Sequence, residues 1–257
     1  MSKYIAKKPD ANGHIDFTPE ENQTWQILYE RQVNVVENRA CDEYLAGLKK
    51  LAMPHDRVPQ CAEINEVLQE QTGFSVVPVE TIIPLESFFT LLANRQFPAA
   101  SFIRLREELD FLQEPDIFHE YFGHCPLLTH PAYADFVQWY GEIALTTTRQ
   151  AQSLLGRLFW FTIEFGLLQT ANGLRIYGGG ILSSYQETFY ALENPAPQRV
   201  PFQVEKILHT PYRYDEIQNC YFVIDSIETL FHIKAENIIQ LVENIIEAPQ
   251  VDSFVIC

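Results

Sequence analysis

Residues 115–124 of the chain read PDIFHEYFGH and place two imidazoles and two carboxylates within nine positions. The whole sequence of 257 residues contains only seven histidines, so this density is unusual. Either histidine alone would more readily be a satisfied polar side chain near the end of a helix. A pair of histidines flanked by carboxylates is instead typical of metal sites. The segment therefore predicts a metal centre held by His119 and His124.

The spacing of the two histidines restricts the kind of metal site. Zinc proteases place their histidines four residues apart on one helix face, with a glutamate between them as the general base. Here the interval is five, which on an ideal α-helix would rotate the two side chains apart by about 140°. Gly123 has no side chain and permits a local departure from the helix that lets the rings converge. The spacing thus argues against a standard zinc-protease helix and weakens a general-base role for Glu120.

A third ligand is expected from elsewhere in the chain. Ferrous iron is commonly held on one face by two histidines and one carboxylate. Glu164 is the best candidate, because it lies in the apolar stretch FWFTIEFG at residues 159–166, where an unpaired charge is costly to bury. The alternative is a glutamate on the solvent-exposed face of an amphipathic helix. Phe161 and Phe165 give Glu164 an apolar neighbourhood on several sides and favour the ligand interpretation.

Charge and composition exclude several classes of function. The chain has 34 acidic and 18 basic residues, hence a formal charge of −16. This deficit of basic residues argues against a nucleic-acid partner and against a polybasic membrane-surface site. No apolar stretch approaches the roughly 20 residues of a membrane span, and no signal peptide is recognisable. The five cysteines are scattered without a CxxC pair, which predicts reduced thiols in a cytoplasmic protein.

The pattern along the chain predicts a mainly α fold with small β pieces, an α+β class. No repeat or Gly/Ser linker interrupts it, which predicts one catalytic domain over residues 1–257, with residues 1–20 as an extended arm. Thr18 followed by Pro19 marks a helix start, and Gly73 marks a helix end. Helices are expected from residue 19 and over 41–51, 62–71, 85–94, 133–168 and 235–246, and strands over 74–79, 174–177 and 220–224.

Three motifs in order resemble one known family. Residues 115–126 (PDIFHEYFGHCP), 160–167 (WFTIEFGL) and 177–184 (YGGGILSS) are similar to segments of the tetrahydropterin-dependent aromatic amino acid hydroxylases. The likeness extends from about Trp25 to about Ser226 and is strongest to the bacterial members that hydroxylate phenylalanine. The resemblance implies a single-domain catalytic fold. It also implies iron ligation by His119, His124 and Glu164.

The activity implied by this resemblance is hydroxylation of L-phenylalanine to L-tyrosine, a step of phenylalanine catabolism, with non-haem Fe(II), tetrahydropterin and O2. Pocket shape sets the choice of ring, so the same chemistry on tryptophan or tyrosine is an alternative. A zinc-dependent hydrolase and a non-enzymatic metal protein are more distant ones. The expected partners are thus small molecules, without nucleic acid or membrane.

Further site residues follow from the resemblance alone. Arg104 is expected to bind the substrate carboxylate, although without the family a surface salt bridge with Glu107 or Glu108 is nearly as plausible. Asp116 is expected to support Arg104. The other expected roles are substrate-pocket walls for Pro115 and Trp160, a hydrogen bond to a ligand histidine for Ser183, and pterin contacts for Phe88, Ile83 and Glu120. Glu120 is also the expected catalytic residue. Phe88 would otherwise be interpreted as a core residue, and Ser183 as a loop residue.

Two positions and both ends of the chain depart from the animal members of this family. Phe159 stands where they have a tyrosine, so no hydroxyl at that position is required here. Leu112 replaces a threonine near the substrate carboxylate. About two dozen residues precede the resemblance, and no sustained heptad pattern follows Ala235. We therefore expect neither a regulatory nor a tetramerisation domain, and a monomer or dimer instead of a coiled-coil tetramer.

Overall fold

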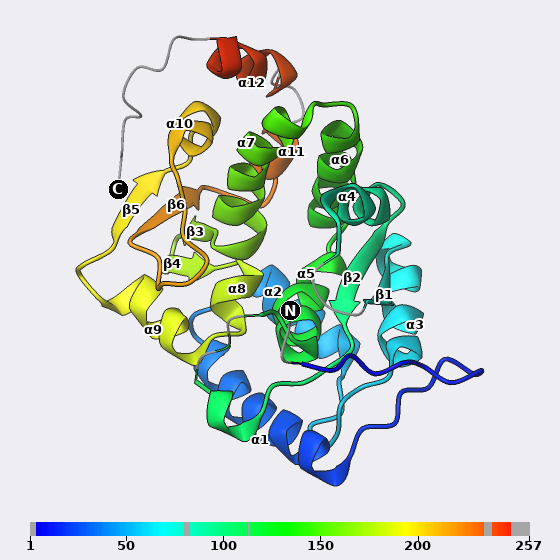
Figure 1. Cartoon of the computed structure of the whole chain (residues 1–257). Coiled ribbons are helices and arrows are strands. Elements are labelled where there is room, and N and C mark those ends of the chain that lie inside the picture. The colour runs from blue at the N-terminus through cyan, green and yellow to red at the C-terminus, as the bar shows by residue number, and fades with distance from the viewer. Residues whose placement is uncertain (1–3, 80–82, 111, 113, 234–237, 248–257) are drawn as a thin grey trace.

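The computed structural model describes residues 4–79, 83–110, 112, 114–233 and 238–247. Figure 1 shows helices through most of the chain, with one sheet on each side of the molecule. This arrangement confirms the predicted α+β class, mainly helical with small β pieces. Among the described residues, no helix is both long enough and apolar enough to cross a bilayer.

Helix boundaries mostly lie where the sequence signals predict them. Thr18 and Glu21 form a reciprocal capping box: the Thr18 hydroxyl accepts from the Glu21 amide at 3.2 Å, and the Glu21 carboxylate accepts from the Thr18 amide at 2.6 Å. Gly73 ends the third helix with a φ of 75°. The α-helices are α1 (Pro19–Val36), α2 (Asp42–Leu51), α3 (Cys61–Thr72), α4 (Leu85–Ala93), α5 (Cys125–Leu128), α6 (Pro131–Leu145), α7 (Arg149–Phe159), α8 (Gly179–Leu182), α9 (Tyr185–Glu193), α10 (Val204–His209), α11 (Thr229–Ile233) and α12 (Ile238–Glu247).

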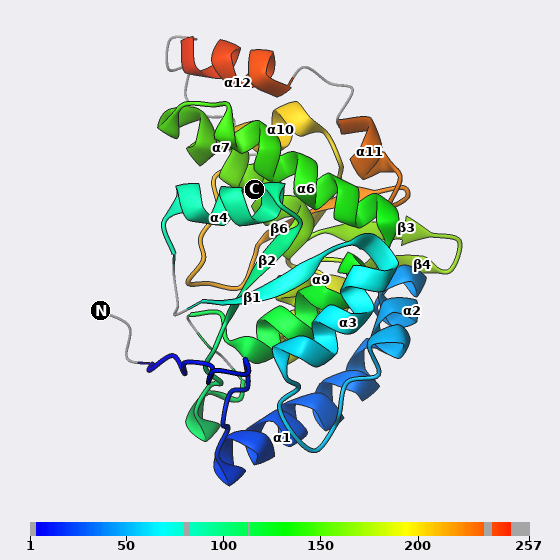
Figure 2. The same cartoon turned by 90° about the vertical axis from the view of Figure 1, so that its right-hand side faces the viewer.

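Two small sheets complete the described fold. β1 (Ser75–Val79) and β2 (Gln96–Ala100) pair in parallel, and Figure 2 shows them between α3 and α4. The second sheet has the order β4-β3-β6-β5 and mixes parallel with antiparallel pairing. Its strands are β3 (Leu167–Thr170), β4 (Gly173–Ile176), β5 (Gln198–Pro201) and β6 (Cys220–Ile224). The strands predicted over 74–79, 174–177 and 220–224 are thus confirmed as β1, β4 and β6.

The prediction of helix throughout residues 133–168 is wrong in two places: residues 146–148 interrupt the helix between α6 and α7, and its C-terminal end is not helical. The chain leaves the helix after Glu164, and Leu167 and Leu168 enter β3, where they pair with both β4 and β6. β2 and β5 were not predicted, because each contains a proline and owes its pairing to a distant strand. The predicted C-terminal helix is described from Ile238, and residues 235–237 lie outside the described residues.

The β3–β4 hairpin places two functional segments side by side. The chain turns at Gly173, which has a φ of 97°, and returns antiparallel to β3. Immediately beyond the paired residues, the amides of Tyr177 and Gly178 donate to the Gly166 carbonyl at 3.2 and 3.0 Å. As a result, the glycine-rich turn at residues 178–180 lies against the backbone of Glu164.

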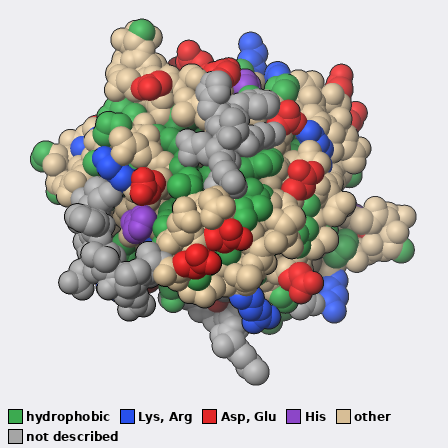
Figure 3. Space-filling model, turned by 90° about the horizontal axis from the view of Figure 1, so that it is seen from above, with side chains coloured by type: hydrophobic (Ala, Val, Ile, Leu, Met, Phe, Trp, Pro, Cys, Tyr) green, Lys and Arg blue, Asp and Glu red, His purple; other side chains and the backbone are tan. Residues whose placement is uncertain are grey.

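On the face of the molecule seen from above, acidic side chains are dispersed and are not gathered into one patch. Figure 3 shows them scattered over the face seen from above, with fewer basic side chains between them. Dispersed charge of one sign keeps a protein soluble without creating a single binding site. The acidic side chains of this face, which contribute to the formal charge of −16, are therefore not concentrated at one site.

Candidate active site

Both segments predicted to carry metal ligands are π-helical. His119–His124 forms one such turn and Trp160–Glu164 forms the other. In the second, the Phe165 amide donates to the Trp160 carbonyl at 2.8 Å, the i to i+5 bond that defines this geometry. A turn this wide returns to the same side after five residues instead of four. The interval of five therefore lets the two histidine side chains converge, because the turn departs from the α-helix as the presence of Gly123 predicted.

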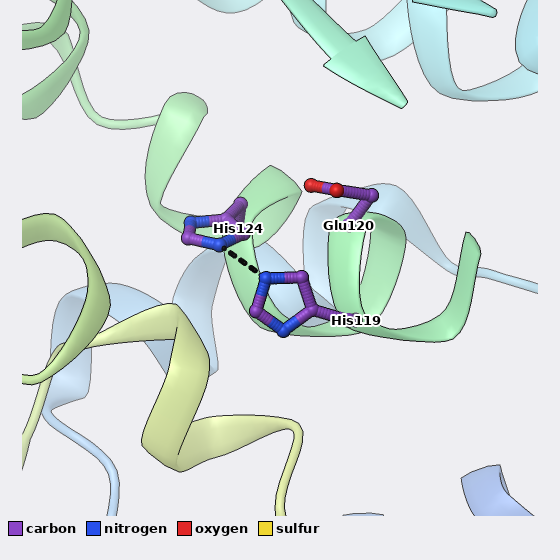
Figure 4. Close-up of side chains that lie close together, drawn as sticks. All are labelled: His119, Glu120 and His124. Atoms are coloured by element: carbon purple, nitrogen blue, oxygen red, sulfur yellow. Dashed lines mark hydrogen bonds between the residues drawn. The ribbon is translucent and has the colours of Figure 1, made fainter. Parts of the chain in front are cut away.

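The two imidazoles and the Glu164 carboxylate converge on one point. Figure 4 shows the rings of His119 and His124 meeting edge-to-face, with their Nε2 atoms 3.1 Å apart. The two carboxylate oxygens of Glu164 lie 3.3 Å from Nε2 of His124 and 3.6 Å from Nε2 of His119. Donor atoms bound at right angles about 2.1 Å from one ion lie about 3 Å apart. The donor atoms thus fit a single metal ion, and two imidazoles with one carboxylate suit ferrous iron.

Glu120 is a second carboxylate near the histidines, but it fits the metal less well than Glu164. One of its oxygens lies within 4.8 Å of a ligand atom of each histidine. Figure 4 shows it on the same helical segment, outside the contact between the two rings. Glu164 is closer to both Nε2 atoms and has one oxygen for each. The shorter separations favour Glu164 as the third donor.

Burial sets the protonation states around these donors. It lowers the pKa of the His119 imidazole to about 4, so the ring is neutral at pH 7, the form that binds metal. Burial, together with the charges of Glu164 and Asp116, raises the pKa of Glu120 well above its ordinary value. For Glu164, burial is outweighed by the neighbouring His124 and His119, and its pKa lies below the ordinary value.

Ser183 and the glycine-rich turn hold the ligand side chains from behind. The Ser183 hydroxyl lies 2.9 Å from Nδ1 of His119, which fixes the ring and leaves Nε2 for the metal. A Cβ on Gly179 would lie 2.4 Å from Cε1 of His124, and one on Gly178 would lie 2.3 Å from the Glu164 carbonyl oxygen. His124 and Glu164 can therefore occupy these positions only because the turn has no side chains.

Arg104 and Asp116 form a buried ion pair beside the metal site. Nε and Nη2 of Arg104 donate to the two oxygens of Asp116 at 2.8 and 2.9 Å, and the Arg104 amide donates at 2.9 Å. The structure thus pairs Arg104 with Asp116, and not with Glu107 or Glu108 at the surface. Burial would raise the pKa of Asp116, but Arg104 and backbone donors hold it below its ordinary value. Nη1 of Arg104 has no protein partner among the described residues.

A cavity of about 700 Å³ joins these groups. Six of the predicted site residues line it: Arg104, Pro115, His119, Trp160, Glu164 and Ser183. His124 and Asp116 are buried behind the wall, with 0% exposure. The lining also includes residues that sequence analysis did not assign, chiefly Glu187 and the segment around Tyr212, Tyr214, Glu216 and Ile217. These residues carry no motif of their own and reach the site only through the tertiary fold.

The residues predicted to contact pterin lie outside this cavity lining. The half-buried Phe88 ring meets the Phe159 ring edge-to-face at 5.4 Å, and Phe159 packs on Tyr140 at 5.3 Å. Ile83 is half-buried where the chain enters α4, and Glu120 is 8% exposed. Leu112, one of the two departures noted above, does line the cavity. The pterin role of Phe88, Ile83 and Glu120 stays a prediction.

Comparison with known proteins identifies the family. A family model described as biopterin-dependent aromatic amino acid hydroxylase matches residues 3–247. The chain belongs to this family. A phenylalanine-4-hydroxylase of Pseudomonas aeruginosa is 51% identical to this hydroxylase, over 94% of this chain and 92% of the relative. The predicted membership, and with it the dependence on a pterin, is thus confirmed.

Solved structures of the family have the same fold. The apo structure of the cold-active phenylalanine hydroxylase from Colwellia psychrerythraea superposes with a TM-score of 0.92 at 47% identity, covering 95% of this chain and 94% of that one. The phenylalanine hydroxylase from Chromobacterium violaceum, solved with bound oxidised Fe(III), gives 0.89 at 43% identity, covering 94% and 88%. This hydroxylase therefore has the fold of the bacterial members.

Proposed function

We propose that the chain hydroxylates L-phenylalanine to L-tyrosine with ferrous iron, dioxygen and a reduced pterin. The observation that carries the proposal is the convergence of His119, His124 and Glu164, with donor atoms 3.1 to 3.6 Å apart, beside a 700 Å³ cavity that also holds Arg104. Relatives about half identical in sequence and named phenylalanine-4-hydroxylase support the choice of phenylalanine.

His119, His124 and Glu164 would hold the iron. When bound, ferrous iron would activate dioxygen; the reduced pterin would supply two electrons and the substrate ring the other two, so that one oxygen atom would go to the ring and the other to the pterin. The protein keeps His119 neutral by burial and orients its ring through the Ser183 hydroxyl. The donor set is thereby fixed before the substrate arrives, which avoids reorganisation during the reaction.

The substrate carboxylate would bind the Arg104 guanidinium. Two of the guanidinium nitrogens are fixed by Asp116, and Nη1 is left for an incoming anion. Because the pair is buried, the guanidinium keeps one orientation, and a charge-assisted bond there is strong. With the carboxylate held by Arg104, the aromatic ring would lie between Pro115 and Trp160, toward His119. This placement orients the ring relative to the metal ligands.

The pterin would stack on Phe88. The Phe88 ring already makes an edge-to-face contact with Phe159, and aromatic stacking adds affinity beyond the area buried. Glu120, a buried carboxyl on the metal-binding turn, would face the pterin from that turn. We assign Ile83 to the same side because it precedes α4.

The direct test is an assay of the purified protein with defined additions. With ferrous iron, tetrahydropterin and oxygen, we expect phenylalanine to yield tyrosine, and we expect little product when pterin is omitted or zinc replaces iron. A Glu164→Ala variant should lose bound iron and turnover together. Product formed equally with zinc would favour a hydrolase-like metal site. Faster turnover of tryptophan or tyrosine would reassign the substrate.

We further propose that the protein works as a monomer or dimer. Ile238 and Val242, two apolar residues of α12, are buried in their own chain and are not available for a coiled coil. Sedimentation velocity would report the assembly directly. A tetramer at micromolar concentration would contradict this proposal while leaving the proposed reaction untouched.

A further inference from the structure

Gln218 is buried beside the cavity, and its backbone amide N–H and both polar atoms of its side chain take part in local hydrogen bonds. Its side-chain oxygen accepts from the indole N–H of Trp160 at 2.9 Å. Its side-chain amide donates to the carbonyls of Arg213 and Glu216, each at 2.8 Å. Its backbone amide donates to the Glu187 carboxylate at 3.1 Å. One residue therefore ties the Trp160 ring, the loop at 211–217 and α9 together.

The same loop also contacts the face of Trp160. The Tyr212 ring stacks on the indole with centroids 4.4 Å apart and an interplanar angle of 17°, and Phe165 packs on it at 4.5 Å. Stacking on both neighbours restrains the plane of the ring. The hydrogen bond to Gln218 adds a directional restraint at the N–H edge, because among the described residues Trp160 has no other acceptor for its N–H.

Trp160 lines the cavity in which the substrate ring is proposed to lie. A displacement of its indole changes the width of that cavity. The selectivity between aromatic rings depends on small differences in pocket width. Losing the acceptor would leave a polar N–H without a partner, which favours any rotation that reaches water or another acceptor. Gln218 thus restrains the direction of the indole N–H, while Tyr212 and Phe165 hold the plane of the ring.

We propose that Gln218 is a positioning residue that sets ring selectivity by fixing the indole of Trp160. This inference rests on the proposed function, because it assumes that an aromatic amino acid occupies the cavity. Gln218 itself does not line the cavity. Its effect is exerted through Trp160 and through the loop at 211–217.

The test is a Gln218→Leu variant, which keeps a similar volume and removes the side-chain hydrogen bonds. We compare the Michaelis constant of phenylalanine with the inhibition constant of tryptophan as a competitor. The inhibition constant of tryptophan divided by the Michaelis constant of phenylalanine should fall about fivefold, which is the effect of losing one hydrogen bond. A Gln152→Leu variant is the matched control, because Gln152 donates to the Ala144 carbonyl at 3.1 Å and does not line the cavity. It should leave the ratio unchanged.

A second readout does not depend on activity. In ¹⁵N spectra the chain gives three indole N–H signals, since it has three tryptophans. The signal that disappears in Trp160→Phe belongs to Trp160. It should shift and exchange faster with solvent in Gln218→Leu, while the other two stay in place. An unchanged Trp160 signal in a folded Gln218→Leu variant would overturn the inference.

The double variant Trp160→Phe/Gln218→Leu tests whether Gln218 acts through Trp160. The phenyl side chain at position 160 of the Trp160→Phe variant has no N–H for Gln218 to accept. Adding Gln218→Leu should therefore leave the selectivity ratio at the value that Trp160→Phe alone gives. Additive changes in the ratio would overturn the inference. If the wild-type protein does not form tyrosine at all, the proposed function fails instead, and the indole signals still report on the hydrogen bond.

Discussion

Asp116 shows how much positioning a single carboxylate can supply. Its two oxygens accept hydrogen bonds from the Arg104 amide and guanidinium and from the His119 amide, all between 2.8 and 3.0 Å. One side chain thereby fixes both the proposed binding group for the substrate and the first residue of the metal-binding turn. A buried ion pair satisfied in this way is costly to break from one side.

An Asp116→Asn variant should raise the Michaelis constant of phenylalanine at least tenfold and lower the unfolding free energy by about 3 kcal/mol, because it leaves Arg104 buried without its counter-charge. Steady-state kinetics and urea unfolding measure the two effects. Asp110→Asn is the control, since Asp110 forms a surface pair with Arg31 at 2.6 Å. That change should cost less than about 1 kcal/mol. Equal losses in both variants would refute the role of Asp116.

At the residue scale, the sequence predicted which side chains converge better than it predicted how they do so. His119, His124, Glu164 and Arg104 were identified from spacing, apolar context and family resemblance. The π-helical turns could only be suspected from Gly123. Gln218 and Glu187 were not identified, because their contacts come from the tertiary meeting of α9, β6 and the loop at 211–217. A residue that acts through distant partners leaves no local pattern.

At the scale of elements, the β3–β4 hairpin supports the metal site. It returns the chain so that the glycine-rich turn lies directly on the backbone of Glu164. The sequence predicted β4 but assigned Leu167 and Leu168 to a helix. The local apolar pattern there is compatible with both structures, and pairing with β6 decides between them.

A Gly178→Ala variant should lose metal affinity and at least about 2 kcal/mol of stability. Its Cβ would lie 2.3 Å from the Glu164 carbonyl oxygen and 2.5 Å from the Gly166 nitrogen, both of them backbone atoms that cannot easily move. Titration with ferrous iron and thermal unfolding check the two effects. Gly156→Ala in α7 is the control, because its Cβ would meet nothing closer than 3.7 Å. That substitution should be neutral or slightly stabilising.

Glu187 links α9 to β6 through bonds from the Gln218 amide and the Tyr221 hydroxyl. Burial raises its pKa to about 7, against an ordinary value of 4.5. The folded state therefore holds a proton that the unfolded state has already released, and this contribution to stability falls as pH rises from 4.5 through 7. Glu187→Gln removes that dependence. Wild type should lose about 2 kcal/mol relative to the variant between pH 5.5 and 8, measured by urea unfolding. Parallel pH profiles would contradict the assignment.

At the scale of the whole molecule, one metal ion would join segments that are 40 residues apart in sequence. His119–His124 and Trp160–Glu164 are connected by the helices α5, α6 and α7, and their donor atoms meet within 3.6 Å. Any ion bound there therefore favours the folded chain over the unfolded one. The fold class could be predicted from composition and periodicity, whereas the order of the strands could not.

Saturating Co²⁺, used as a probe of metal binding without substrate or pterin, should raise the unfolding temperature of the wild-type protein by about 5 °C or more. A free concentration one hundred times the dissociation constant contributes about 2.7 kcal/mol, and each kcal/mol shifts the midpoint of a chain this long by about 2 to 4 °C. Differential scanning calorimetry measures the shift. Glu164→Ala should show a much smaller one, and an equal shift in both proteins would place the ion elsewhere.

The two π-helical turns make the count of residues matter as much as their identity. A substitution inside His119–His124 leaves every other side chain facing the same way. If the turn took up a regular α-helix with all of its residues present, the interval of five would place the two histidines about 140° apart around the axis. The site should therefore tolerate exchanges at Tyr121 or Phe122 that conserve volume, yet lose metal affinity with any change that restores a regular α-helix at this length. The metal-binding turns thus depend on their backbone geometry as much as on their ligand side chains.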